Sequence, residues 1–468
     1  SAAPYLVFGG ASVAANTGLF GGLSYFGSQS IETDRLFTFA GTAPNSGARV
    51  LSNGLYSLST ATQNNAALIF TNTAPLAFAT PNVEQGLSLG GNSTGDNRFG
   101  PQITDNGTGR VSLFKLDVGL WHLDNAANSY TGVTSVFGGM LGSSSGSTLP
   151  GNSPLLLSGG KLYSSGTFTR NATAVLTPGN ANEVLISFGV SGFAAGASKL
   201  VVALGGVGSE QALTWGSPEF TPTQFTLNSA VSFADVEVRN PINLNGATRT
   251  VNVLDNTLIG ADFATLSGVI SGGAGSNFIK SGAGILFVGG ANTYEGATQI
   301  SQGTLVVSSL GSSSGGASSS LGASGIAMDN NNALLLGNGS TAGGILQHAG
   351  PGETSDRKIR LNSTTASNQI HADSVGPLIL TNVANDLAAG AKTLFLRGVN
   401  AGGNMITSRL SDNGGSLTII IDGSATWILT NEDNDFTGLI AASGGALGIG
   451  HDSALGVGTF ELSGGPVF

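Results

Sequence analysis

The stretch GAGILFVGGANTYEGATQISQGTLVV, residues 282–307, decides what kind of fold this chain has. Apolar and small polar residues alternate in it, the alternation breaks at Gly-Gly (289–290) and at Asn-Thr-Tyr (292–294), and it then resumes. Alternation with a period of two is typical of a β-strand with one buried face, and Gly and Asn are typical turn residues. The stretch therefore predicts strand, turn, strand, turn, strand.

The same pattern occurs twice more, as GLWHLDNAANSYTGVTSVFGGML at residues 119–141 and as ATWILTNEDNDFTGLIAASGGAL at residues 425–447. An alignment without gaps superimposes an asparagine, a following aromatic residue, two glycines and a leucine in all three copies. A unit of three strands cannot bury its own apolar face, so such units must stack on one another. The alignment predicts seven inward-facing side chains, which are Trp121, Tyr130, Ile285, Phe287, Tyr294, Trp427 and Phe436.

These repeats predict an all-β fold, a right-handed parallel β-solenoid, with the handedness inferred from the twist of the chain. We expect residues 1–468 to form one continuous solenoid. Its internal modules are expected at approximately 1–141, 142–305 and 306–447, with 448–468 completing the first module of the next subunit.

Residues 284–307 match nearly throughout a pattern that includes the segments Asn-Thr-Tyr-x-Gly and Gly-Thr-Leu-x-Val, and the preceding LSGVISGGAG at 266–275 has the same character. In these segments the chain resembles the autotransporter-associated β-strand repeat of large bacterial surface proteins. The resemblance implies a bacterial β-helix that is exported to the cell surface or the extracellular space. It does not imply any enzymatic activity.

Composition excludes several classes of function. The 468 residues carry a net charge of −10 and only 17 Lys and Arg, which disfavours a nucleic-acid partner because such binding needs a basic surface. The chain has no Cys, so it has no disulfide framework and no thiolate metal site. No apolar run approaches the ~20 residues of a transmembrane segment. We predict no cofactor.

Two groups of polar residues are candidates for a metal site or a catalytic site. The acidic corner from Asn431 to Asp435 offers oxygen ligands that suit Ca²⁺, but only this copy of the corner is acidic, so a solvated turn is the prediction. The four histidines lie far apart in the sequence, and His122 has the parity of an outward-facing residue. The carboxylates form no recurring cluster of the kind that a hydrolase or lyase needs. We therefore predict no metal site, no catalytic site and no enzyme.

The sequence is consistent with three functions. The preferred one is a structural subunit of an extracellular bacterial filament or sheath, and the alternative is the passenger or stalk of an autotransporter-like surface adhesin. A carbohydrate-active β-helix enzyme is the third. The filament is preferred because the segments SAAPYLVFGG (1–10) and FELSGGPVF (460–468) are apolar and strand-like. Exposed strand edges are templates for another chain, and no polar cap covers them.

The expected partner is therefore a second copy of the chain, bound head to tail, and a contact with the cell surface or a polysaccharide stays open. The predicted subunit contact places residues near the start of the chain against residues near its end. These are Tyr5, Leu6, Val7 and Phe8 on one side, and Leu462, Val467 and Phe468 on the other.

Overall fold

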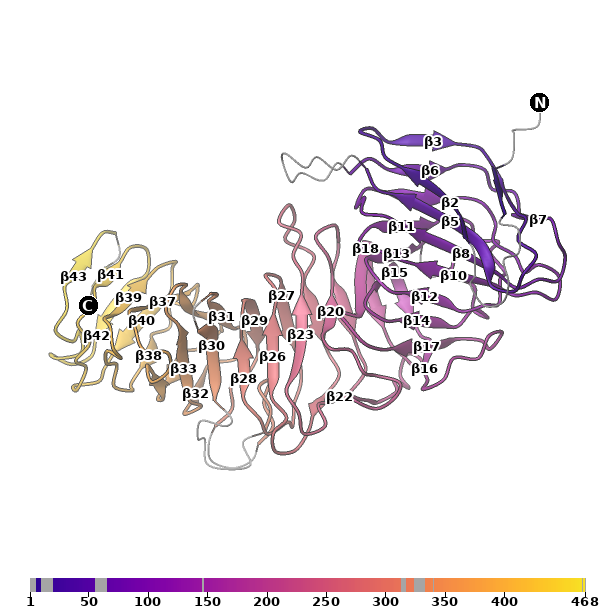
Figure 1. Ribbon diagram of the computed structural model, residues 1–468. Coiled ribbons are helices and arrows are strands. Elements are labelled where there is room, and N and C mark those ends of the chain that lie inside the picture. The colour runs from indigo at the N-terminus through magenta and orange to yellow at the C-terminus, as the bar shows by residue number, and fades with distance from the viewer. Residues whose placement is uncertain are drawn as a thin grey trace. The chain divides into compact units, whose positions relative to one another are not determined.

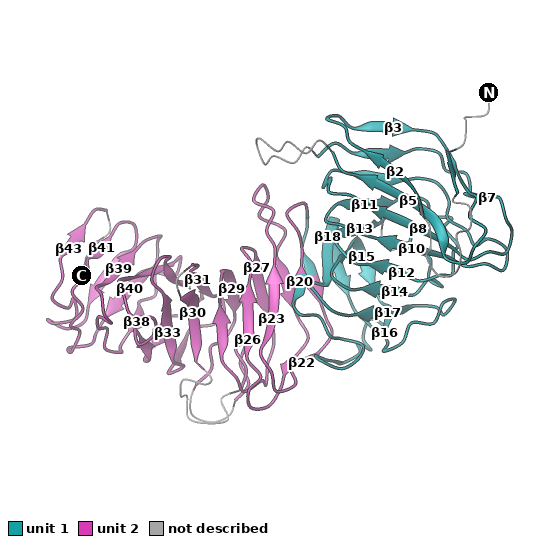
Figure 2. Ribbon diagram, in the orientation of Figure 1, with its two compact units in different colours: residues 1–226, 232–236 teal, residues 227–231, 237–468 magenta. Residues whose placement is uncertain are grey.

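The computed structural model describes residues 6–9, 20–54, 65–144, 147–312, 317–323, 333–339, 341–464 and 466–467. The chain forms two compact units, and each is described by itself (Figure 2). Unit 1 comprises residues 1–226 and 232–236, and unit 2 comprises residues 227–231 and 237–468. The regular structure in the described residues is made of β-strands, with no α-helix among them, and none of these residues forms a helix that could cross a membrane.

In unit 1, successive strands pair in parallel with strands one rung further along, which gives three stacks (Figure 1). The first stack is β1 (Leu6–Phe8), β4 (Phe37–Phe39) and β7 (Ala77–Phe78). The second is β2 (Phe20–Tyr25), β5 (Ser46–Ser52), β8 (Gln85–Gly90), β10 (Val111–Lys115), β12 (Thr134–Val136), β14 (Leu155–Leu157), β17 (Glu183–Ile186) and β16 (Asn171–Ala172). The third is β3 (Ile31–Thr33), β6 (Leu68–Phe70), β9 (Asn97–Phe99), β11 (Leu120–Leu123), β13 (Met140–Ser143), β15 (Lys161–Phe168) and β18 (Gly192–Val202), and β19 (Leu213–Thr214) is a short strand of this unit.

Unit 2 is built in the same way. One stack is β23 (Arg249–Val253), β26 (Phe278–Ser281), β28 (Thr298–Ile300), β30 (Leu334–Gly339), β33 (Ile359–Ser363) and β36 (Val383–Ala384). The next is β24 (Ala264–Leu266), β27 (Ile285–Val288), β29 (Gly303–Val307), β31 (Gly344–His348), β34 (Asn368–Ala372), β37 (Lys392–Gly398), β39 (Leu417–Ile421), β41 (Ile440–Ala442) and β43 (Phe460–Leu462). The third side carries β22 (Ile242–Asn243) and β25 (Ile270–Ser271), then β32 (Glu353–Ser355), β35 (Leu378–Leu380), β38 (Asn404–Ile406), β40 (Thr426–Leu429) and β42 (Ala446–Ile449).

The prediction of an all-β parallel solenoid is confirmed, whereas its handedness and its three modules stay predictions. The division between the two units falls within β20 (Phe225–Leu227) and β21 (Val236–Val238). Along most strands, buried and partly exposed residues alternate, as in β10 and β34, because alternate side chains point into the stack. The core is therefore a set of apolar columns that run from rung to rung.

The corner asparagines join neighbouring rungs in all three copies. Asn128 Oδ1 accepts a hydrogen bond from the Ile103 backbone N at 2.8 Å, and its Nδ2 donates to the Thr148 carbonyl at 2.9 Å. One side chain thus joins the rung before it to the rung after it. The other two corners repeat this arrangement. Asn292 joins Ile270 to Ser320, and Asn434 joins Leu410 to Ala454.

The aromatic residue after each asparagine plugs the corner from inside. Tyr130 and Tyr294 are buried, and their hydroxyls share hydrogen bonds with Thr134 at 2.8 Å and with Thr298 at 2.7 Å. Burial raises the pKa of both tyrosines to about 12. Phe436 is fully buried at the same place in the third copy.

Five of the seven residues expected inside lie there, but Ile285 and Phe287 do not. Trp121 and Trp427 are fully buried, whereas Ile285 is half-buried and Phe287 is 36% exposed. In this copy the buried residues of the strand are Leu286 and Val288.

The strand register shows why the gapless alignment was wrong here. Trp121 pairs with Leu141 and Trp427 with Leu447, but the residue that pairs with the matching Leu305 is Leu286. The second copy has one residue fewer between its strand and its corner asparagine. Gly290, at φ +73°, turns the chain in that shorter space. A shift of one residue sends every side chain of a strand to the opposite face.

Candidate functional site

The predicted subunit-contact residues are only partly within the described structure. Tyr5 and Phe468 lie outside the described residues. Leu6–Phe8 form β1, which pairs with β4, and the Phe8 ring packs on Phe37 with centroids 5.1 Å apart. Phe8 is therefore buried within unit 1, while Val7 is 66% exposed.

At the other end of the sequence, Leu462 is half exposed in β43, and Val467 bridges to Leu447. These two residues belong to unit 2, and those of β1 belong to unit 1. A contact between copies of the chain stays a prediction.

The acidic corner does not converge on a cation site. Asp435 pairs with Arg409, and Glu432 lies 3.6 Å from the His451 ring. The side chains of Asn431 and Asn434 form hydrogen bonds with neighbouring main-chain groups. Among the described residues, no group of three or more His, Asp or Glu side chains is placed to hold a metal ion.

One charged cluster forms on the outer face of unit 1. The strand register places His122 beside Arg98 on β9 and beside Gly142 on β13. Arg98 donates to Asp96 at 2.8 Å and to Asp124 at 3.2 Å, and His122 Nε2 lies 3.2 Å from Asp96.

The imidazole of His122 lies over Gly142, where a Cβ would come within 2.3 Å of Nδ1, and it meets the Tyr163 ring edge-on at 5.4 Å. Burial lowers the pKa of His122, and the Asp96 carboxylate opposes that shift. Both carboxylates of the cluster are committed to ion pairs, so the cluster is suited to holding rungs together.

A second set of charged groups lies inside the stacks. Lys115 and Lys280 are fully buried at equivalent positions of the first and second copies, where the third copy has Ile421. Lys280 Nζ donates to the carbonyls of Gly282 and Gln302 at 2.6 and 2.9 Å. Burial lowers the pKa of both lysines to about 7.

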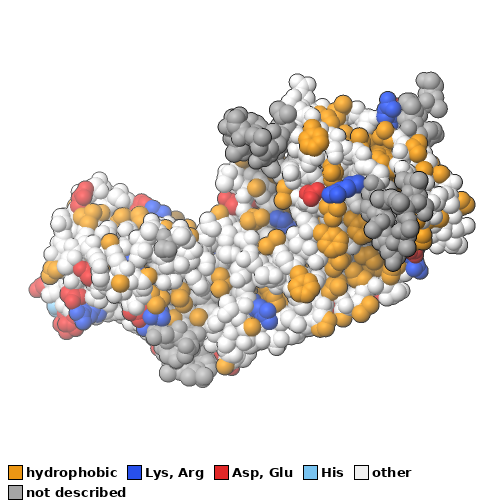
Figure 3. All heavy atoms as spheres, viewed as in Figure 1, with side chains coloured by type: hydrophobic (Ala, Val, Ile, Leu, Met, Phe, Trp, Pro, Cys, Tyr) orange, Lys and Arg blue, Asp and Glu red, His pale blue; other side chains and the backbone are white. Residues whose placement is uncertain are grey.

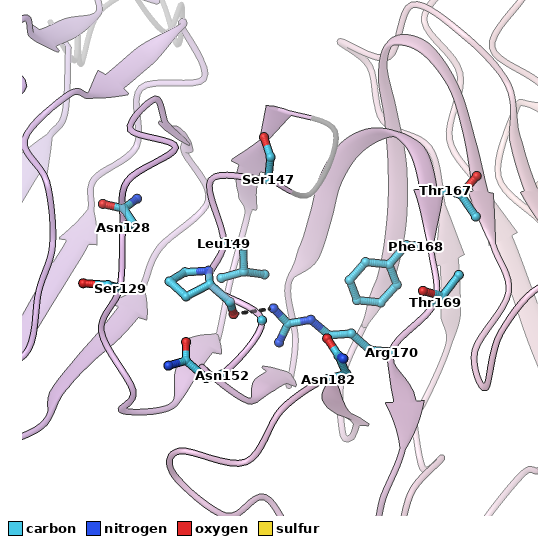
Figure 4. Close-up of a pocket in the computed structure, with 12 residues that line it drawn as sticks. Asn128, Ser129, Ser147, Leu149, Asn152, Thr167, Phe168, Thr169, Arg170 and Asn182 are labelled. Carbon is cyan, nitrogen blue, oxygen red and sulfur yellow. Dashed lines mark hydrogen bonds between the residues drawn. The ribbon is translucent and has the colours of Figure 1, made fainter.

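Unit 1 has an open groove of about 480 Å³ beside the first corner (Figure 4). Leu149, Pro150 and Phe168 are buried and form its floor. Arg170 extends between Phe168 and Pro150 and is itself only 6% exposed. The rim consists of exposed polar side chains, which are Ser129, Ser147, Asn152, Thr167, Thr169 and Asn182.

The guanidinium of Arg170 donates hydrogen bonds to main-chain carbonyls. Its Nη2 donates to the Pro150 carbonyl at 2.8 Å, and its Nη1 donates to the carbonyls of Ser153 and Glu183. Burial lowers the pKa of Arg170 to about 10. At neutral pH the group is still a cation, and its role is to tie the turn at 150–153 to Glu183 at the start of β17.

Sequence reasoning missed this groove. Ser129 follows the corner asparagine, Asn152 lies in a turn, and Asn182 lies beyond β16, so the three are far apart along the chain. The stacking of rungs brings them together: Asn182 N donates to the Gly151 carbonyl at 2.7 Å, and the side chain of Asn128, the neighbour of Ser129, donates to the Thr148 carbonyl at 2.9 Å. The only signal in the sequence is a high content of Asn, Ser and Thr, which turns share in general.

Comparison with known proteins agrees with this architecture. The chain matches the model of the passenger-associated-transport-repeat at residues 113–141, 278–307 and 422–449. It is 32% identical over 191 residues to the adhesin BmaC autotransporter of Brucella suis biovar 1 (strain 1330). That match covers 40% of this chain and 5% of the relative's length. No solved structure matches the chain.

These matches confirm the resemblance to autotransporter-associated repeat proteins and indicate a protein of the bacterial cell surface. The first matched segment spans β10 to β13, and the second spans β26 to β29. The third spans β40 to β42. Strands within each matched segment pair with each other, as β10 does with β12 and β11 with β13, so the repeat recognised in sequence covers parts of two consecutive rungs together with the corner asparagine between them.

Proposed function

We propose that this chain is part of the passenger of an autotransporter-like surface adhesin, in which the solenoid is a non-catalytic body that presents binding surfaces. One observation carries the proposal: the passenger-associated repeats coincide with the parallel rungs, in a chain that is similar to an adhesin autotransporter. Because the chain spans only about 5% of that relative's length, the activity of the whole protein is part of the proposal.

The outer surface supports a binding role. Figure 3 shows hydrophobic side chains gathered on one face of unit 1. Exposed large apolar side chains of this unit include Val118, Phe137 and Phe188, which are 57%, 46% and 70% exposed. Large exposed apolar patches mark sites of interaction with a protein or a membrane, or grooves that bind a ligand.

The arrangement of carboxylates also supports a non-catalytic role. Hydrolysis of a glycosidic bond needs two carboxyl groups that face each other across a groove. Here several outward carboxylates are engaged by cations, as Asp386 is by Lys358 and Arg360, both at 2.7 Å. The groove of unit 1 has no acidic residue among its lining residues.

The comparisons favour this adhesin alternative over the filament or sheath subunit, which they do not support. The filament was preferred because of the apolar character of residues 1–10 and 460–468. The same apolar, strand-like character suits rungs in the body of a longer solenoid, since every rung presents open edges to the next one.

The test is attachment by the organism that makes the protein. A strain whose full gene lacks the codons for residues 1–468 should attach less well to host cells or surfaces than the parent strain, while its remaining passenger still reaches the surface. The measurement is the number of attached cells, with surface exposure checked by antibody on intact cells. Equal attachment by both strains, with equal surface exposure, contradicts the proposal.

A further inference from the structure

We propose that the groove of unit 1 binds a segment of an uncharged oligosaccharide. This inference rests on the proposed adhesin function and adds the chemical class of a ligand. A hexose unit has apolar C–H faces and hydroxyl groups that both donate and accept hydrogen bonds. A complementary site therefore needs an apolar floor, a rim of amides and hydroxyls, and little net charge.

The floor and the size of the groove meet the first requirement. Leu149, Pro150 and Phe168 close the bottom, and Figure 4 shows Leu149 and Phe168 facing each other across the hollow. The volume of about 480 Å³ lies within the roughly 300–1,000 Å³ of small-ligand pockets.

The rim meets the second requirement. Ser129, Asn152 and Thr169 are exposed, and none of their side chains hydrogen-bonds to another described residue. Asn182, at φ 58°, presents a further amide beside Gly151, to whose carbonyl its backbone N donates at 2.7 Å. An amide has two donors and one acceptor oxygen, and a hydroxyl has both roles, so this set can pair with sugar hydroxyls of either polarity.

The charge of the groove decides between a neutral and a charged sugar. Among the described residues that line it there is no Asp or Glu, and the one cation, Arg170, donates to three main-chain carbonyls. A uronic acid, sialic acid or sulfated unit would need a cation with donors to spare. Arg170 directs three of its five N–H donors at main-chain carbonyls and is only 6% exposed, so it offers little to such a unit, and the groove is suited to an uncharged chain.

The experiment uses the full chain of residues 1–468 and four soluble probes: maltotetraose, cellotetraose and mannotetraose, which are uncharged, and tetragalacturonate, which is anionic. Binding is measured by saturation-transfer difference NMR and then by titration. Ser129→Trp fills the groove and should weaken binding at least about tenfold. Asn152→Ala removes a rim amide and should weaken it about three- to tenfold.

Matched controls separate the groove from general effects. Ser198→Trp adds the same ring at an exposed position of β18, and Asn92→Ala removes an exposed amide elsewhere in unit 1. Both should bind like the parent chain, and circular dichroism should show that all four variants are folded.

Three outcomes overturn the inference: no uncharged probe binds, tetragalacturonate binds best, or Ser129→Trp binds as well as Ser198→Trp. If no probe binds but deletion of residues 1–468 abolishes attachment, the inference fails and the adhesin function stands. If an uncharged probe binds at the groove but the deletion strain attaches normally, the inference stands and the adhesin function fails.

Discussion

Single asparagine side chains hold successive rungs together. Each corner asparagine satisfies a backbone N–H of one rung and a backbone carbonyl of another, and both groups are buried with it. A buried main-chain group that loses its partner costs about 1–3 kcal/mol. Stability at the corners therefore depends on one functional group with a donor and an acceptor in fixed positions, which few other side chains can replace.

Asn434→Ala should lower the free energy of unfolding of unit 2 by about 3 kcal/mol, because the Leu410 N–H and the Ala454 carbonyl both lose a partner. Urea denaturation followed by tryptophan fluorescence measures the change. Asp452→Ala, at an exposed position nearby, is the control and should have little effect. Equal stability of the two variants would show that the corner does not depend on the amide.

Substitutions in β27, a strand of the second copy, test which of its side chains face the core. Leu286→Ala removes a fully buried side chain and should cost about 2–5 kcal/mol. Phe287→Ala removes a larger side chain, but one that is exposed and packs only at its edge on Phe263, with centroids 5.0 Å apart, and should cost about 1 kcal/mol. A larger loss for Phe287→Ala than for Leu286→Ala in urea denaturation would contradict the register.

At the scale of an element, the strand β10 ends in Lys115 and the strand β26 carries Lys280 as its next-to-last residue, and both ammonium groups are turned into the stack. The ammonium donates to carbonyls of the two turns that follow, as Lys115 does to Asp117 at 2.9 Å and to Gly138 at 3.1 Å. These bonds fix the turn, while the loss of hydration disfavours the charge. Each of these strands therefore carries, at or next to its last residue, an ammonium group whose protonation responds to pH.

The sign of that response follows from the lowered pKa. Lys280 titrates near 7 in the folded chain and near its ordinary 10.5 when unfolded, so between these values the unfolded state binds more protons. Stability should rise with pH across this window, by up to about 1.4 kcal/mol per pH unit for one lysine. Below pH 7 this contribution to the slope disappears.

Lys280→Ile, which copies the third repeat at Ile421, should remove one lysine's share of that slope. The measurement is the urea midpoint of the parent and the variant between pH 7 and 9.5. Parallel pH profiles for the two proteins would mean that Lys280 does not change its protonation on unfolding.

At the scale of the whole molecule, strands at the edges of the stacks bear on self-association. In the described part of the chain β1 pairs with β4 alone and β43 with β41 alone, and Phe460 and Leu462 of β43 are 40% and 52% exposed. If copies associate head to tail, the intact chain should sediment as larger species at high concentration. A chain without residues 1–8 should sediment as a monomer. If the intact chain sediments as a monomer at high concentration, this prediction is wrong.

The sequence by itself determined the repeating unit, because strand alternation, turn glycines and the Asn-x-aromatic corner are local properties of the chain. Those properties led to the parallel solenoid and to the inward positions of Trp121, Tyr130 and Trp427. Only the tertiary structure decided the face of Phe287, since the parity of a strand depends on its register with the next rung. It also decided that Lys280 lies inside, where turn carbonyls accept its hydrogen bonds. The groove beside Asn152 exists for the same reason: stacking joins rungs whose residues are distant along the chain, and a local pattern cannot specify which loops then meet.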